Sequence, residues 1–260
     1  MADSVNLHHS ELGQGTPVVL LHGFPLSGVI WREQQQRLSD RFRVITPDLR
    51  GHGRSPAPSG VYEMDLLARD VLALLDALLI KKAVILGHSM GGYVALAAWK
   101  LAPDRFLALG LIASQAGADT EEGRQGRYKL ADKVAAEGSK VVAEAMLPKL
   151  FAPNLPAGAP IIDQVRQMIL STPSAGIIGA LKGMAARPDS GPLLSTIRIP
   201  ALILTGDKDQ IIPPAKAQAM AATLATATLT IVDNAGHMPM LEQPDTTTTA
   251  IRKFLSGVGA

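Results

Sequence analysis

The stretch that decides the fold is AVILGHSMGGYVALAAWKL, residues 83–101. It opens with a continuous apolar run over 83–86, which is typical of a parallel strand buried on both faces. It closes with apolar residues at helical spacing over 93–101. We therefore predict a buried strand, a sharp turn and a helix in direct succession.

The turn between them has the pattern G-x-S-x-G, formed by Gly87-His88-Ser89-Met90-Gly91. A strand that reverses sharply into a helix brings the residues two before and two after the serine together. Gly87 and Gly91 carry no side chains that would clash there. Such a turn lifts the Ser89 hydroxyl away from the backbone and faces it with helix amides. Ser89 is therefore a candidate nucleophile, and a serine in an ordinary glycine-rich turn is the alternative.

Composition limits the classes of protein to consider. The chain has 260 residues, 47% of them hydrophobic and 18% charged, which suits a globular protein with a large core. Its net charge of +2 is too small to indicate nucleic acid or a membrane surface as a partner. Cysteine is absent, which excludes disulfides and thiolate metal sites. The first residues lack a signal-peptide pattern and no apolar run spans a bilayer, so we expect a cytoplasmic location.

Strands and helices alternate along most of the chain. Besides the central strand, we expect strands at 5–9, 17–21, 43–47, 106–113, 201–205 and 227–232. We expect further helices at 31–38, 62–79, 214–224 and 244–255. This alternation predicts a largely parallel sheet with helices on both faces.

The alternation stops between residues 118 and 192. This part has helical segments divided by glycine and proline, and no convincing strand. The expected helices lie at 121–137, 140–151, 161–170 and 175–186. We therefore expect residues 1–117 and 193–260 to form the core, with residues 118–192 inserted into it as a helical block.

A serine hydroxyl needs a base, and the base needs an orienting acid. Ligands of open α/β sheets bind beyond the carboxyl ends of the strands, so the partners of Ser89 are expected to follow strands. Asp207 and Asp209 follow the strand expected at 201–205, and His237 follows the one at 227–232. The order along the chain is Ser, Asp, His, with either aspartate able to be the acid.

These segments resemble the α/β-hydrolase fold family, and the resemblance covers nearly the whole chain. It rests on His22-Gly23-Phe24-Pro25, DLRGHGRS at 48–55, GHSMGG at 87–92, Gly206-x-x-Asp209-x-x-x-Pro213 and Gly236-His237. Five segments in the family's order are far more specific than any one of them. The resemblance implies an α/β-hydrolase fold with an inserted helical cap and a serine hydrolase active site.

Within the family pattern, the acid falls on Asp209. Asp207 is then a turn residue, a role that aspartate commonly fills, and Asp233 is expected to be a solvated turn residue too. The base is expected to be His237. The competing histidines are set aside because they lie in the N-terminal segment (His8, His9), in tight structural loops (His22, His52) or beside the serine but directed away from it (His88).

The oxyanion of an attacked ester needs two preorganised donors. One is the Met90 backbone N–H at the start of the helix, and the resemblance implies that the other is the Phe24 N–H. Pro25 has no N–H to offer. We expect the Phe24 ring to line the acyl pocket, and Met146 and Leu147 of the cap to contact the substrate.

Serine at the turn argues against the family's dehalogenases and epoxide hydrolases, which place aspartate there. We expect a carboxylesterase for small, largely apolar esters. A lactonase such as an enol-lactonase is the alternative within the class, and a non-catalytic ligand-binding relative is the alternative outside it. Arg124 and Arg127 are expected to pair with neighbouring glutamates or face solvent. No phosphate loop or metal spacing is present, so we expect no cofactor and no metal.

Overall fold

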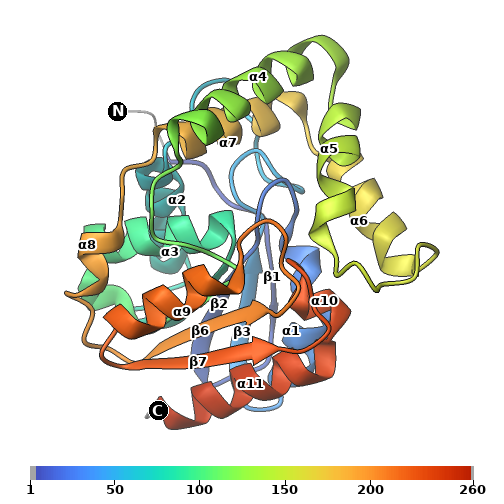
Figure 1. Ribbon diagram of the computed structural model, residues 1–260. Coiled ribbons are helices and arrows are strands. Elements are labelled where there is room, and N and C mark those ends of the chain that lie inside the picture. Colours follow the sequence, from blue (N-terminus) through green and yellow to red (C-terminus); the bar gives the residue numbers. More distant parts are fainter. Residues whose placement is uncertain (1–3, 259–260) are drawn as a thin grey trace.

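Seven strands form one sheet in the computed structural model, which describes residues 4–258 (Figure 1). The strand order is β1-β3-β2-β4-β5-β6-β7. β1 runs antiparallel to β3 and all other pairs are parallel. The strands are β1 (His9–Leu12), β2 (Thr16–Leu21), β3 (Phe42–Pro47), β4 (Ala83–His88), β5 (Phe106–Ile112), β6 (Ala201–Gly206) and β7 (Ala227–Val232). The predicted fold class, a mostly parallel sheet with helices, is confirmed.

β4 lies between β2 and β5, and all six of its residues are buried. Burial on both faces explains why its sequence shows no alternation of apolar and polar residues. The register pairs Leu21 with Gly87, and His88 with Ile112. Ile112 in turn pairs with Leu204. The carboxyl ends of β2, β4, β5 and β6 therefore lie at the same edge of the sheet.

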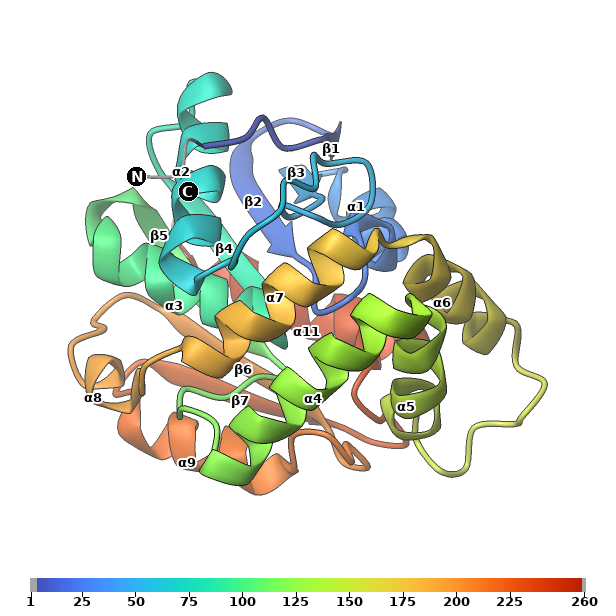
Figure 2. The same cartoon turned by 90° about the horizontal axis from the view of Figure 1, so that it is seen from above.

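Helices cover both faces of the sheet. α1 packs against α11 on one face and α2 against α3 on the other, while α9 packs against β6 and β7 (Figures 1 and 2). The helices outside the insertion are η1 (Gly28–Trp31), α1 (Arg32–Leu38), α2 (Met64–Ala77), α3 (Met90–Leu101), η2 (Pro103–Arg105), α9 (Pro214–Thr223), α10 (Pro239–Glu242) and α11 (Pro244–Gly257). Among the described residues, no helix combines the length and the apolar character needed to cross a bilayer.

The segment between β5 and β6 is helical. Its elements are α4 (Glu121–Glu137), α5 (Lys140–Leu150), α6 (Pro160–Ser171), α7 (Ser174–Ala186) and α8 (Gly191–Leu194). α4 lies alongside α7, and α5 packs against both α4 and α6 (Figure 2). These helices occupy the expected insertion. The division of the chain into a core and a cap stays a prediction, and residues 1–3 and 259–260 of that core lie outside the described residues.

Some elements differ from those expected. The first strand was expected at 5–9, whereas β1 spans His9–Leu12. The Val5 N–H donates to the Asp70 carboxylate (3.0 Å) and the His8 N–H to Ser55 Oγ (2.9 Å), so these two N–H groups bond side chains and do not pair with a neighbouring strand. α8 and α10 were not predicted, because a single helical turn is too short to show a hydrophobic period.

Candidate active site

Ser89 lies in the turn between β4 and α3. Its backbone angles, φ 49° and ψ −114°, fall in a region that residues with side chains rarely adopt. Gly87 permits this turn, since a Cβ atom there would lie 2.2 Å from the Gly91 carbonyl oxygen. Ser89 itself is partly exposed. The strand, sharp turn and helix expected from the sequence are all present.

The neighbouring strand fixes the backbone of Ser89. The Ser89 N–H donates to the Ile112 carbonyl (2.9 Å), and the Ser89 carbonyl accepts a hydrogen bond from Ser114 Oγ (2.9 Å). Ile112 is the last residue of β5, and Ser114 lies two residues beyond it. Ser114 belongs to none of the motifs in the sequence, and only its hydrogen bond in the structure reveals that it supports Ser89.

Asp209 and His237 form a buried pair beyond the ends of β6 and β7. His237 Nδ1 lies 2.8 Å from Asp209 Oδ2, and the side chains are 2% and 0% exposed. The other carboxylate oxygen of Asp209 accepts the N–H groups of Ile211 (2.8 Å) and Ile212 (2.9 Å). The carboxylate is thus held on both oxygens, which fixes its orientation towards His237.

The second aspartate at this strand end has other partners. Asp207 accepts the Ala235 N–H (3.3 Å) and forms an ion pair with Lys208 (2.9 Å). Burial acts to raise the pKa of the Asp207 carboxyl, but Lys208 and the backbone donors outweigh it and lower that pKa. Asp233 is exposed. Of the candidate acids, the structure brings Asp209 to His237 and leaves Asp207 in the turn.

His88 is tied to the loop that carries His237. Its Nε2–H donates to the His237 carbonyl (2.8 Å), and the two rings lie 4.9 Å apart between centroids. Burial holds the pKa of His88 well below its ordinary value, and His237 lowers it further. A neutral ring protonated on Nε2 fits this hydrogen bond. Sequence reasoning set His88 aside as a base, and it missed this contact.

The segment expected to supply an oxyanion donor lies against Ser89. A Cβ atom built on Gly23 would be 3.1 Å from Ser89 Cβ and 2.6 Å from His88 Nδ1, so the two loops touch here. Phe24 follows directly and its side chain is buried. Met90 is the first residue of α3, where no turn of helix precedes it to accept its N–H. The roles of the Phe24 and Met90 N–H groups stay predictions.

The histidines outside the Asp209 pair make structural contacts. His22 donates from Nδ1 to the Gly23 carbonyl (2.9 Å) and accepts the Leu49 N–H at Nε2 (2.8 Å). His52 bonds the Arg50 carbonyl through Nδ1 (2.9 Å). Burial lowers the pKa of His22 and lowers that of His52 to about 3. Both rings are therefore neutral, and their hydrogen bonds hold the backbone of the loops that follow β2 and β3.

The expected substrate contacts lie on α5. Leu147 is buried, and Met146 is partly buried against the core. Arg124 pairs with Glu121, as expected, whereas Arg127 pairs with Asp119 and not with a glutamate. That Met146, Leu147 and the Phe24 ring contact a substrate stays a prediction.

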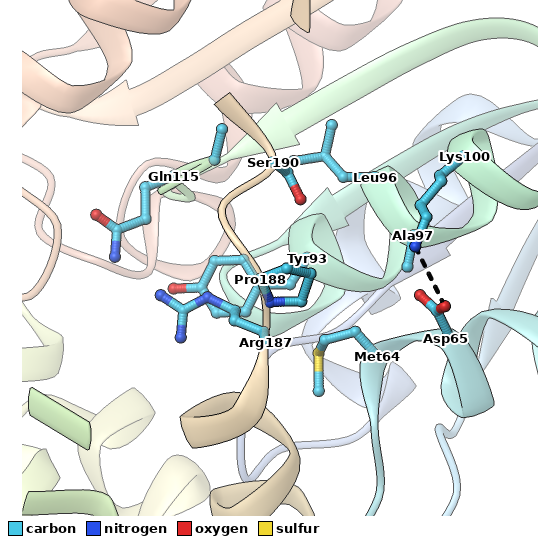
Figure 3. Close-up of a pocket in the computed structure, with 11 residues that line it drawn as sticks. Met64, Asp65, Tyr93, Leu96, Ala97, Lys100, Gln115, Arg187, Pro188 and Ser190 are labelled. Atoms are coloured by element: carbon cyan, nitrogen blue, oxygen red, sulfur yellow. Dashed lines mark hydrogen bonds and ion pairs between the residues drawn. The ribbon is translucent and has the colours of Figure 1, made fainter. Parts of the chain in front are cut away.

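A separate hollow lies beside α3, where the insertion joins the sheet (Figure 3). Arg187 lies over the Tyr93 ring, 4.2 Å from its centroid, and forms an ion pair with Asp119 (2.8 Å). Neither Ser89 nor His237 lines this hollow, so it is not the site predicted from the sequence. Within residues 4–258, no three His, Asp or Glu side chains are grouped so that they could hold a metal ion.

Comparison with known proteins establishes the class. A family model described as the alpha/beta hydrolase fold matches residues 16–244. The match spans most of the chain and includes Ser89 and the Asp209–His237 pair. The chain therefore belongs to the α/β-hydrolase family, and the resemblance seen in the sequence is confirmed.

Particular relatives include both esterases and enol-lactonases. The structure is similar to that of a thermophilic esterase from Thermogutta terrifontis, with 41% identity, a TM-score of 0.96, and coverage of 98% of this chain and 95% of that one. It is also similar to an enol-lactonase from Burkholderia xenovorans LB400, with 30% identity, a TM-score of 0.90 and 97% of each chain covered. The sequence is 28% identical over 257 residues to 3-oxoadipate enol-lactonase 2 of Acinetobacter baylyi, covering 98% of this chain and 94% of that protein.

Proposed function

We propose that the protein is a serine carboxylesterase that hydrolyses small, largely apolar esters through an acyl-enzyme intermediate on Ser89. The observation that carries the proposal is the buried Asp209–His237 hydrogen bond of 2.8 Å, at the sheet edge where Ser89 is presented. The likeness to an esterase at 41% identity supports it. Strained serine, oriented histidine and buried aspartate together match what acyl transfer requires.

In this mechanism His237 is the general base. Its Nδ1–H is donated to Asp209, so Nε2 carries the lone pair that takes the Ser89 proton. The Ser89 oxygen then forms a bond to the ester carbonyl carbon, and the carbonyl oxygen becomes an oxyanion. The Phe24 and Met90 N–H groups donate hydrogen bonds to that oxyanion.

The acyl group is then transferred to water in two steps. The tetrahedral intermediate breaks its bond to the alcohol oxygen, which receives the proton held by His237. A water molecule, deprotonated by the same ring, attacks the acyl carbonyl carbon. The bond to Ser89 breaks, the carboxylic acid leaves, and the serine regains its proton from His237.

Lactone hydrolysis is the second candidate, because both an enol-lactonase structure and an enol-lactonase sequence are similar to this chain. A lactone is a cyclic ester, so its leaving alcohol stays attached to the acyl group. Ser89, His237 and Asp209 would then play the same roles. Substrate preference separates the two activities. We expect residues of the helical segment between β5 and β6 to influence that preference.

Covalent labelling tests the proposal. We expect a fluorophosphonate to label the wild-type protein, and Ser89→Ala and His237→Ala to lose about a million-fold in turnover of a neutral p-nitrophenyl ester. Ser256→Ala, at an exposed serine of α11, is the matched control and should behave as wild type. Hydrolysis that persists in folded Ser89→Ala would reject the mechanism. A folded wild type with neither labelling nor hydrolysis would favour the non-catalytic alternative.

A further inference from the structure

Glu242, in the short helix α10, binds the backbone on both sides of His237. Its Oε1 accepts the Gly236 N–H (2.9 Å) and the Met238 N–H (3.1 Å). These two residues are the immediate neighbours of His237 in the chain. One carboxylate oxygen therefore holds the peptide groups that determine where the His237 side chain leaves the backbone.

The other oxygen of Glu242 connects this loop to the insertion. Oε2 accepts the N–H of Ala152 (2.7 Å), which lies just beyond the end of α5. Two residues earlier, the Leu150 carbonyl accepts the His237 N–H (3.0 Å). The His237 loop and the end of α5 are thus joined by hydrogen bonds that run in both directions.

The His237 loop and the end of α5 are in direct backbone contact. A Cβ atom on Gly236 would lie 2.5 Å from the Ala152 nitrogen, so the two backbones touch directly. Phe151, between Leu150 and Ala152, accepts a further bond from Gln210 Nε2 (3.2 Å) beside Asp209. The end of α5 is therefore packed against the loops of both Asp209 and His237.

Only a carboxylate satisfies all three donors. Glutamine has a single acceptor oxygen, and its NH₂ group would face at least one of the N–H groups. Burial raises the pKa of Glu242, the three N–H donors oppose this, and Asp209 adds to the increase. Hydrogen bonds to an ionised acceptor are roughly twice as strong as neutral ones.

We propose that Glu242 is a positioning residue for the base: it fixes the backbone of His237 while Asp209 fixes the ring, and it couples both to the end of α5. The assignment of His237 as the base rests on the proposed function. A displacement of about 1 Å at a reacting group can lower the rate by about a hundred-fold. Loss of the Glu242 carboxylate therefore lowers turnover without removing any group that touches the substrate.

The test compares Glu242→Gln with Glu144→Gln, the same change at an exposed residue of α5. Rates are measured on a neutral p-nitrophenyl ester and divided by the number of serines titrated with a fluorophosphonate. We expect kcat of Glu242→Gln to fall by about ten- to a hundred-fold while KM changes by less than about two-fold. The control should match the wild type.

The pH profile separates positioning from a general loss of stability. Glu242, Asp209 and the neutral His88 are the titratable groups packed around His237. Removing one of two negative charges favours neutral His237, so the midpoint of kcat/KM should move to lower pH in Glu242→Gln. Glu242→Asp keeps the charge but shortens the reach, so its midpoint should stay near that of the wild type while kcat falls. A loss confined to the fraction of titratable serine, with kcat and pH midpoint unchanged, would overturn the proposal.

Hydrogen exchange provides a readout that does not depend on catalysis. We expect the amides of Gly236, Met238 and Ala152 to exchange at least about ten-fold faster in Glu242→Gln than in Glu144→Gln. Unchanged exchange at all three amides would overturn the positioning role of Glu242, whatever the protein hydrolyses. A wild type that no fluorophosphonate labels would instead count against the proposed function, and the exchange result would still decide the role of Glu242.

Discussion

Two aspartates that are two positions apart in the chain have different partners in the structure. Asp209 binds His237 and two backbone N–H groups, while Asp207 binds Lys208 and the turn at Ala235. Both follow the same strand, so the motif alone favoured Asp209 without excluding Asp207. The difference arises because two backbone N–H groups hold one oxygen of Asp209 and leave the other directed at His237, whereas the oxygens of Asp207 bind Ala235 and Lys208.

We expect Asp209→Asn to lower kcat by about 10⁴-fold, since an amide favours the wrong tautomer of His237. Asp207→Asn keeps the His237 contact and should lose much less, within about ten-fold. Steady-state kinetics on a neutral ester, with both proteins checked by circular dichroism, measure this. Equal losses would leave Asp209 without its special role, and a larger loss in Asp207→Asn would reverse the assignment.

The pH dependence follows from the states of the histidines. His237 must be neutral to accept the Ser89 proton, so activity should rise with pH through a single ionisation. Burial lowers the pKa of His22 and His88, and lowers that of His52 to about 3, so these three rings are not expected to add a step to the profile. A profile of kcat/KM from about pH 4 to about pH 9 checks this. A rise in two resolved steps, or a fall with increasing pH over this range, would contradict it.

Which site residues could be predicted depends on how they act. Ser89, Asp209 and His237 sit in motifs tied to strand ends, so their positions follow from the strand pattern. His88, Ser114 and Glu242 act by binding backbone atoms of residues elsewhere in the fold. Any residue with a suitable donor or acceptor can make such a bond, so the sequence does not reveal these contacts, even for His88 within the motif at 87–91.

At the scale of elements, the strands and long helices were predictable because each carries a period or an apolar run over several residues. β4 and α2 follow the expected patterns closely. The bounds of the first strand and the single turns α8 and α10 could not be predicted, because side-chain and backbone contacts specific to this fold determine them. The helices α4, α5, α6 and α7 between β5 and β6 also follow from the sequence, whereas the contacts that hold them do not.

Arg187 holds the two ends of the insertion together. It follows α7 directly, its side chain is 3% exposed, and it pairs with Asp119 just before α4. It also donates to the Gly117 carbonyl (3.1 Å) and lies over the Tyr93 ring of α3 (Figure 3). Without Arg187, Asp119 would keep only Arg127 as a cationic partner, and the Gly117 carbonyl and the Tyr93 ring would lose their contacts.

We therefore expect Arg187→Gln to lower the free energy of unfolding by about 2 kcal/mol, less than the loss of a sole partner would cost, because Asp119 keeps its ion pair with Arg127. Urea unfolding followed by circular dichroism measures it. Arg166→Gln, at an exposed arginine of α6, is the control and should change stability little. If Arg187→Gln is as stable as this control, the network does not hold the insertion.

At the scale of the whole molecule, the charges of the insertion bear on the choice between ester and lactone. Arg124 and Arg127, one helical turn apart on α4, each have a carboxylate partner, Glu121 and Asp119 respectively. Asp119 is shared with Arg187, which adds a second cation to the same group. These arginines are thus engaged within the protein and would have to give up an ion pair to bind a substrate carboxylate.

We therefore expect neutral esters of short to medium acyl chains to be preferred over anionic ones. Moving a carboxylate from water into a site where these arginines already have partners costs several kcal/mol, so kcat/KM should fall by about a hundred-fold or more. p-Nitrophenyl butyrate and the mono-p-nitrophenyl ester of succinic acid have acyl chains of equal length and differ in this charge. A neutral lactone and a carboxylate-bearing lactone form the second matched pair. If the anionic lactone has the highest kcat/KM of the four, the protein is an enol-lactonase-like enzyme and the carboxylesterase proposal is wrong.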